Sequence, residues 1–144
     1  WKPKPHIKSY QKLKRKLKQL TNRSRSISLD ERIKQINYLV RGWVNYFRIA
    51  NMKKAIKDID EHLRTRIRVI IWKQWKRITP REKALIKLGV KPQLAHQVAC
   101  TRKGYYQICK TTYVKFAINT ERLRKRGLVF LLDQYTKVHM ECTN

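Results

Sequence analysis

The sequence predicts an all-α protein, with a three-helix antiparallel bundle followed by a small subdomain of short helices. Three segments of the first half space their apolar residues three and four apart, the period of a helix with one buried face. No stretch alternates apolar and polar residues with a period of two, so no sheet is expected. In the second half glycine and proline interrupt shorter apolar runs, which is typical of short helices joined by tight turns.

The three long helices of the predicted bundle are expected over residues 9–22, 29–50 and 53–75. Ser28 and Glu31 match a capping box, which favours a helix start at that point. Asn51 can serve as a C-terminal cap for the second helix. Gly42, inside that helix, indicates a close approach by another helix or by a sugar-phosphate chain. The apolar stripes assigned to the core are Tyr10, Leu13, Leu17 and Leu20; Ile33, Ile36, Val40, Trp43, Val44 and Phe47; and Ile56, Ile59, Leu63, Ile67 and Ile70.

The second subdomain is expected to begin after residue 76, which divides the chain into domains 1–76 and 77–144. Thr79 as N-cap and Pro80 at the first helical position predict a short helix that ends at Gly89. Pro92 predicts the start of another short helix, and residues 101–106 a loop. Further short helices are expected near 112–119, 120–126 and 128–137, with a break at Gly127.

The charge balance points to a polyanionic partner. The 144 residues carry 36 Lys and Arg against 9 Asp and Glu, a formal net charge of +27. Such a chain repels itself unless a polyanion covers it, and nucleic acid fits better than a membrane because the basic stretches lack an exposed apolar face. No apolar run is long enough to span a bilayer. The three cysteines follow no disulfide pattern, which favours a reducing compartment, either a bacterial cytoplasm or an organellar matrix.

Cations, an amide and a phenol on predicted helix faces and in one turn are the candidate nucleic-acid contacts. Arginine and lysine bind phosphates, and amides and aromatic rings contact hydroxyls and bases. An ordinary solvated surface is the alternative for each helix face. The candidates are Lys14, Arg15 and Lys18; Lys34, Arg41, Asn45 and Arg48; Arg64 and Arg68; and Arg102, Lys103 and Tyr105.

Two aromatic features keep two interpretations each. Trp72 and Trp75 either stack on nucleic acid beside Arg68 or pack against the second subdomain. The tyrosines of residues 102–106 either contact nucleic acid or pin the loop to the small core.

Catalysis and metal binding find little support in the sequence. It contains no glycine-rich phosphate loop and no nucleophile motif. The acidic cluster Asp58, Asp60 and Glu61 is expected to pair with neighbouring cations. A zinc site is conceivable, although the spacing matches no standard finger. Its ligands would come from His96, Cys100, Cys109, His139 and Cys142.

Several motifs together resemble the C-terminal part of group II intron reverse transcriptases. Residues 41–47, Arg-Gly-Trp-Val-Asn-Tyr-Phe, resemble the RGWxNYF signature of the maturase-specific domain, or domain X. Residues 22–33 and 64–76 are similar to the start of its second helix and to its RxRxxxWxxWK end. Leu88-Gly89 and residues 102–106 resemble the KLG and RKGYW elements of the region that follows, with Tyr106 where the family usually has Trp.

The resemblance implies that residues 1–76 form domain X, the thumb of a polymerase, and that residues 77–144 form its DNA-binding region. The implied partners are intron RNA, a template–primer RNA–DNA duplex, target DNA and the fingers and palm of the parent polymerase. The implied roles are intron splicing and retrohoming of a mobile element. The catalytic palm, where the parent enzyme would use Mg²⁺, is absent, so this chain is expected to need no cofactor and to catalyse nothing itself.

A ribosomal-type structural RNA-binding protein is the rival interpretation. It explains the charge but not the joint set of motifs. Because the chain begins at Trp1 rather than Met, we expect it to be a fragment of a longer protein.

Overall fold

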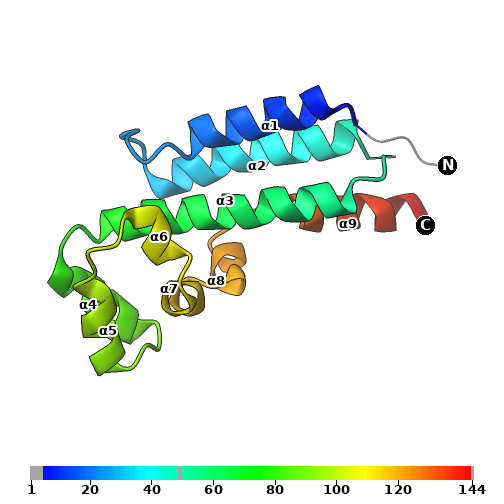
Figure 1. The fold of residues 1–144 in the computed structure, drawn as a ribbon. Coiled ribbons are helices and arrows are strands. Elements are labelled where there is room, and N and C mark those ends of the chain that lie inside the picture. The colour runs from blue at the N-terminus through cyan, green and yellow to red at the C-terminus, as the bar shows by residue number, and fades with distance from the viewer. Residues whose placement is uncertain (1–4, 49, 144) are drawn as a thin grey trace. The chain divides into compact units, whose positions relative to one another are not determined.

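The computed structural model describes residues 5–48 and 50–143, and throughout them the fold is helical without strands, which confirms the predicted class (Figure 1). Contacts divide the chain into two compact units. Unit 1 comprises Trp1–Leu63 and Gly127–Asn144, and unit 2 comprises Arg64–Arg126. The helices are α1 (Ile7–Leu20), α2 (Leu29–Tyr46), α3 (Lys53–Gln74), α4 (Ile78–Lys87), α5 (Pro92–Ala99), α6 (Tyr105–Cys109), α7 (Thr112–Ala117), α8 (Thr120–Lys125) and α9 (Leu131–Thr143).

The core of unit 1 lies between α1, α2 and the first half of α3, which run side by side in alternating directions (Figure 1). Each helix contributes the aliphatic stripe that its periodicity predicts, because one narrow apolar face is all that three packed helices need to bury. Each fully buried aliphatic side chain contributes about 1.5–3 kcal/mol. The buried members include Leu13 and Leu17, Ile36, Val40 and Val44, and Ile56, Ile59 and Leu63.

The start of α2 follows the sequence prediction, and its end does not. Ser28 Oγ accepts a hydrogen bond from the Glu31 N–H at 3.2 Å, which confirms the N-cap. The helix ends at Tyr46 with Phe47 as its C-cap, and the Ala50 N–H then donates to the Phe47 carbonyl at 2.9 Å. The expected end near Ala50–Asn51 is therefore wrong. Apolar spacing shows which face is buried but not where the chain turns.

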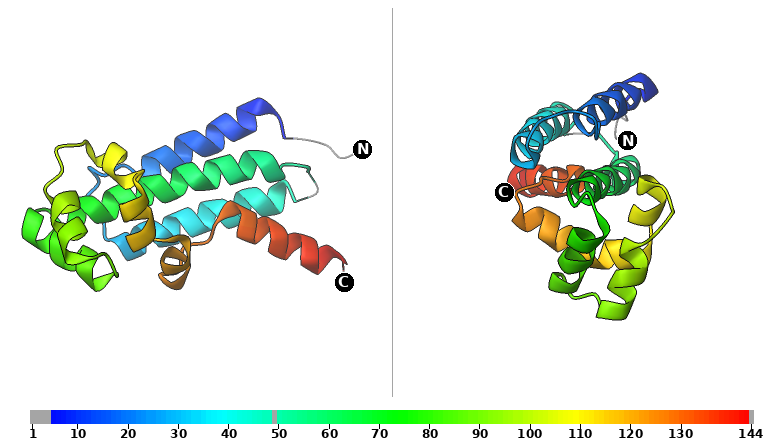
Figure 2. Two further views of the ribbon diagram at one scale, coloured as in Figure 1. Left: turned by 60° about the horizontal axis from the view of Figure 1, so that its bottom comes forward. Right: turned by 90° about the vertical axis from the view of Figure 1, so that its left-hand side faces the viewer.

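Helix α9 joins unit 1 as a helix that the three-helix prediction did not include. It packs against α2 (Figure 2), and Leu131, Tyr135 and Val138 on it are buried. Asp60 of α3 accepts hydrogen bonds from the Leu131 and Leu132 N–H groups at 2.8 and 2.9 Å. Asp60 is therefore a cap for α9, a role that the sequence prediction did not include. Unit 1 therefore includes α9, which is distant in sequence. The division into domains 1–76 and 77–144 stays a prediction.

Asn37 of α2 forms hydrogen bonds with the segment that precedes α9. Its Nδ2 donates to the Gly127 carbonyl at 2.7 Å, and its Oδ1 accepts from the Val129 N–H at 2.8 Å. Gly127 has a φ of +106°, a conformation that favours glycine, so the predicted break lies where expected. One amide side chain thus satisfies the Gly127 carbonyl and the Val129 N–H in the segment that leads into α9.

Unit 2 contains α4 to α8, with α4 packed on α5. The cap of α4 is Arg77 and makes no side-chain hydrogen bond, so the prediction of Thr79 as N-cap is wrong. The end of α4 follows the prediction. Gly89 has a φ of +102°, and the Val90 N–H donates to the Leu85 carbonyl at 2.9 Å, a glycine-terminated Schellman pattern. Pro92 opens α5 as expected, whereas α6 begins at Tyr105, inside the expected loop.

Candidate nucleic-acid interface

Helix α1 presents a basic outer surface. It contains no acidic residue, and its buried side chains, Leu13 and Leu17, leave the rest of the helix to cations. Lys14, Arg15 and Lys18 are all exposed, as predicted for contacts with phosphate. Lys12 and Lys16 are exposed on the same helix. With Lys8, six exposed cations lie on this one short helix, and they produce a local positive potential that its own sequence does not compensate.

Four predicted contacts lie on the outer face of α2 or directly after it: Lys34, Arg41 and Asn45 belong to the helix, and Arg48 follows its C-cap. Lys34, Arg41 and Arg48 are exposed and make no hydrogen bond or ion pair within the described part of the chain. Asn45 is also exposed, but its Oδ1 accepts a hydrogen bond from Gln134 Nε2 of α9 at 3.2 Å. The Asn45 amide oxygen therefore has a partner within the fold. The three cations are the better candidates for contact with nucleic acid.

A buried arginine holds the connection between α1 and α2. Arg32 is 2% exposed, and its guanidinium donates to the carbonyls of Leu20, Asn22 and Arg25 at 2.7, 2.9 and 3.0 Å. Burial, and secondarily the charge of Arg25, lowers the pKa of Arg32. These three bonds fix the loop, so the two basic helices are presented in one arrangement.

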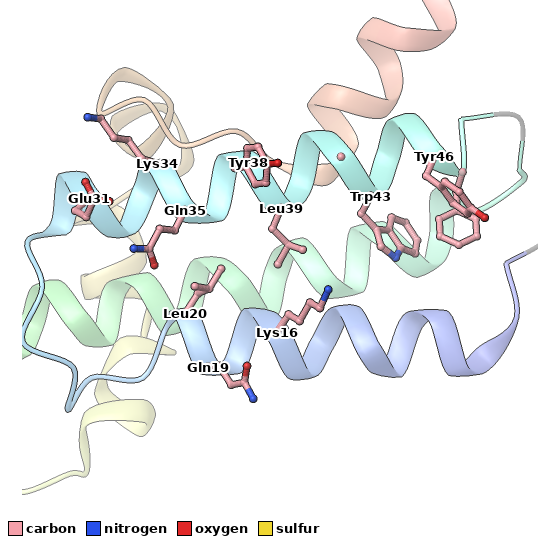
Figure 3. A pocket seen from close by; sticks show the side chains of 12 residues that line it. Lys16, Gln19, Leu20, Glu31, Lys34, Gln35, Tyr38, Leu39, Trp43 and Tyr46 are labelled. Carbon is pink, nitrogen blue, oxygen red and sulfur yellow. The ribbon is translucent and has the colours of Figure 1, made fainter.

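A groove of about 910 Å³ lies along α1 and α2, on the surface of unit 1 (Figure 3). Leu20 of α1 and Leu39 and Trp43 of α2 point into the space between the two helices (Figure 3). Its complete lining is Lys16, Gln19, Leu20, Glu31, Lys34, Gln35, Tyr38, Leu39, Gly42, Trp43, Tyr46 and Phe47. The groove is thus apolar at its floor and carries two lysines.

The aromatic side chains at one end of the groove form a connected set. The Trp43 ring lies 5.6 Å from the Tyr10 ring and 4.7 Å from the Phe47 ring, and the Tyr46 ring meets Phe47 edge-on at 4.8 Å. Trp43 is half-buried, so its assignment to the core is only partly right. Tyr10 packs behind it, and burial, followed by the charge of Tyr135, raises the pKa of Tyr10.

Gly42 lies in this groove with nothing packed against it. Apart from its own helix backbone, a Cβ added there would meet no atom within 4 Å, so no other helix among the described residues approaches this backbone. The prediction of a close approach by another helix is wrong within the described residues, and the approach of a sugar-phosphate chain stays a prediction. A mid-helix glycine costs about 1 kcal/mol relative to alanine.

Of the two predicted contacts on α3, Arg68 belongs to the interior of unit 2 and Arg64 does not. Arg68 is 4% exposed, and its Nε donates to the Ile118 carbonyl at 2.7 Å. Arg68 is therefore excluded from the interface, because a buried guanidinium that donates to an interior carbonyl does not reach phosphate. Arg64 is half-buried. Trp72 is buried, which decides between its two interpretations in favour of packing.

The predicted contacts at the start of α6 remain on the surface in part. Arg102 and Lys103 are exposed. Tyr105 is half-buried, with the Arg81 guanidinium 5.5 Å from its ring centre and 4.8 Å from that of Trp72. Arg81 thus sits between two rings of unit 2. Tyr105 is chiefly a packing residue, and the two cations beside it are available to a ligand.

The described residues contain no group of three or more His, Cys, Asp or Glu arranged to hold a metal ion. His96 bridges Glu82 and Cys100, with Nδ1 3.1 Å from Glu82 Oε2 and Nε2 3.6 Å from Cys100 Sγ. The side chain of Cys142 lies outside the described residues. Within that same part of the chain, no helix combines the length and apolarity that crossing a bilayer requires.

The predicted contacts thus fall into two groups. The seven on α1, on α2 and at Arg48 directly after α2 lie in unit 1, and Arg64, Arg68, Arg102, Lys103 and Tyr105 lie in unit 2. Sequence reasoning missed the exposed ring of Tyr46 and the groove itself. The four-residue spacing of Tyr38, Gly42 and Tyr46 was the signal that could have found them, because residues four apart share a helix face.

The fold and this surface define an all-helical protein with strongly basic helix faces. Residues 10–89 match the family described as "Group II intron, maturase-specific domain", more than half of the chain, and the protein belongs to that family. Membership implies a maturase role in group II intron splicing, with the intron RNA as its partner. A comparison with curated proteins finds no significant match.

Proposed function

We propose that this chain binds folded group II intron RNA through the exposed basic faces of α1 and α2. The observation that carries the proposal is the set of exposed cations on these two helices, with no acidic residue in α1. Phosphate contacts supply most of the sequence-independent affinity of such surfaces. Binding at several points on a rigid pair of helices favours the RNA conformation that matches them, which is how a maturase aids splicing.

The second part of the proposal concerns the polymerase. The chain acts as the thumb and DNA-binding portion of an intron-encoded reverse transcriptase, holding the template–primer duplex and target DNA beside the fingers and palm. Arg102 and Lys103 on unit 2 are the exposed cations that fit a DNA backbone there. The chain works by binding alone and needs no cofactor, and Mg²⁺ belongs to the palm of the parent enzyme.

The Arg41→Ala/Arg48→Ala double variant tests the RNA contact. Each phosphate neutralised contributes about 0.7–0.9 to the slope of log affinity against log salt. Loss of two contacts is expected to reduce that slope by about 1.4–1.8. The measurement is filter binding of the cognate intron transcript over a series of potassium chloride concentrations, with helicity checked by circular dichroism.

Lys53→Ala/Lys57→Ala is the matched control, since it removes the same charge from exposed positions of α3. It is expected to keep the slope of the wild type. An equal fall in slope for both variants would show that net charge alone governs binding. A slope near zero for the wild type would show that phosphate contacts do not govern its binding and would refute the proposal.

A further inference from the structure

Two tyrosines of α2 expose almost their entire side chains beside the groove. Tyr38 is 86% and Tyr46 is 81% exposed. Tyr38 makes no hydrogen bond or ring contact within the described residues. Large rings held in water contribute little to the fold, so their placement beside a groove points to a ligand that covers them.

The spacing of these rings leaves room for a flat ligand. Tyr38, Gly42 and Tyr46 follow at four-residue intervals, so they share one side of α2, with a residue that has no side chain between two rings. The open space at Gly42 lets a ligand reach the helix backbone between them. Behind this row, the Trp43 ring packs between the rings of Tyr10 and Phe47, which fixes its position at the floor of the groove.

The charges around the groove select the ligand. Lys16 of α1 and Lys34 of α2 line it, and Glu31 is its acidic residue (Figure 3). Aromatic rings with cations beside them suit nucleobases joined by phosphates, since bases stack on the rings and lysines neutralise the backbone. A second copy of this chain would bring the same charge of +27 and be repelled. A duplex hides its base faces and offers nothing to stack.

We propose that the α1–α2 groove binds an unpaired RNA strand, with its bases stacked on Tyr38, Tyr46 and Trp43 and its phosphates held by Lys16 and Lys34. The proposal rests on the RNA-binding function proposed above and assigns to this groove the single-stranded segments of that RNA. The neighbouring cations of α1 and α2 bind phosphates of paired regions as well, so the two kinds of contact are separable by experiment.

The Tyr38→Ala/Tyr46→Ala variant tests the stacking contact. The probe is fluorescein-labelled oligoadenylate of about 12 nucleotides, a length within the usual range of single-strand sites. Its affinity, measured by anisotropy, is expected to fall by roughly tenfold or more, while a paired RNA of the same length loses less than about twofold. Tyr38→Phe/Tyr46→Phe keeps the rings and is expected to bind like the wild type. Tyr113→Ala removes an exposed tyrosine of α7 and is the matched control.

Gly42→Leu provides a test in which folding and binding change in opposite directions. The substitution places a side chain in open space and replaces glycine by a good helix former, so Tm is expected to rise by about 2–4 °C. The same side chain blocks the gap between the tyrosines, so oligoadenylate affinity is expected to fall about fivefold. Loss of binding in a more stable protein excludes misfolding as its cause.

Three results would overturn the proposal. The first is wild-type affinity for oligoadenylate in the tyrosine variant while the arginine variant loses intron RNA, which leaves the proposed function intact. The second is an equal loss for single-stranded and paired RNA. The third is normal RNA binding by the groove variants together with loss of their binding to an acidic protein partner. If the wild type bound neither intron RNA nor oligoadenylate, both proposals would fail together.

Discussion

Buried guanidinium groups hold the chain together at two points far apart in sequence. Arg32 binds the three carbonyls of the α1–α2 loop, and Arg68 binds the Ile118 carbonyl inside unit 2. A buried arginine is tolerated only where carbonyls or anions satisfy its donors. In a protein with this many cations, residue type therefore does not separate the structural arginines from those that bind nucleic acid. Their exposure does.

The two described free cysteines are predicted to differ in reactivity. Cys109 is buried, and burial raises its pKa to about 12 against the smaller, opposing effects of Arg68 and Arg81, whereas Cys100 is exposed. Because the thiolate is the reactive form, iodoacetamide is expected to modify Cys100 first and to spare Cys109 in the folded protein. Peptide mass spectrometry after timed quenching measures both rates.

Denaturant supplies the control for that experiment, since both thiols should react at similar rates once the chain unfolds. The raised pKa also means that the folded state holds the Cys109 proton more tightly than the unfolded state. This thiol therefore opposes folding as the pH rises above its ordinary value of 9.0. Equal rates for the two cysteines in the native protein would contradict the buried position of Cys109.

At the scale of the element, helix ends decide where α9 lies. Its first backbone N–H groups have no partner within the helix, and Asp60 of α3 accepts two of them. A carboxylate at a helix N-terminus also interacts favourably with the helix dipole. Tyr135 adds a bond from its hydroxyl to the Ala50 carbonyl at 3.0 Å. The attachment of α9 thus depends on a few polar contacts as well as on its apolar face.

Asp60→Ala is expected to destabilise unit 1 by about 2–4 kcal/mol, because it leaves two N–H groups of α9 without their acceptor. Asp60→Asn retains one acceptor oxygen and is expected to cost roughly half as much. Urea unfolding measures the free energy, and hydrogen exchange at Leu131 and Leu132 localises the effect. Asp58→Asn, at an exposed position on the same helix, is the control. An unchanged exchange rate at both amides would refute the capping role.

At the scale of the whole molecule, both compact units are strongly basic. Unit 1 has 18 basic against 7 acidic side chains, and unit 2 has 18 against 2. Charges of one sign raise the free energy of a compact state, since folding brings them closer together. The excess therefore opposes folding of each unit in isolation and favours binding to a polyanion.

Salt is accordingly expected to act in opposite directions on folding and on binding. Raising sodium chloride screens the repulsion and is predicted to increase Tm by about 2–5 °C. The same increase weakens RNA binding. Thermal melts by circular dichroism and filter binding in matched buffers measure the two effects. A Tm that falls with salt would mean that attractive ion pairs dominate the folded chain.

Local patterns account for the parts of the fold and the site that the sequence predicted. The stripes of α1, α2 and α3, the Ser28 cap and the breaks at Gly89 and Gly127 depend on neighbouring residues only. Pairings between distant residues account for the rest. Trp43, counted as core by its spacing, is half-buried because the partners that cover it, Tyr10 and Phe47, leave one side open to the groove.

The sequence by itself determined a helical, basic protein with the motifs of a maturase, because helical periodicity and net charge are properties of residues taken in order. Only the tertiary structure decided that Arg68 and Asp60 are buried, that α9 completes unit 1 and that aromatic rings border a groove. The physical reason is that burial depends on which elements meet. Asp60 and Leu131 are 71 residues apart, and nothing local to either one indicates that the carboxylate caps the helix.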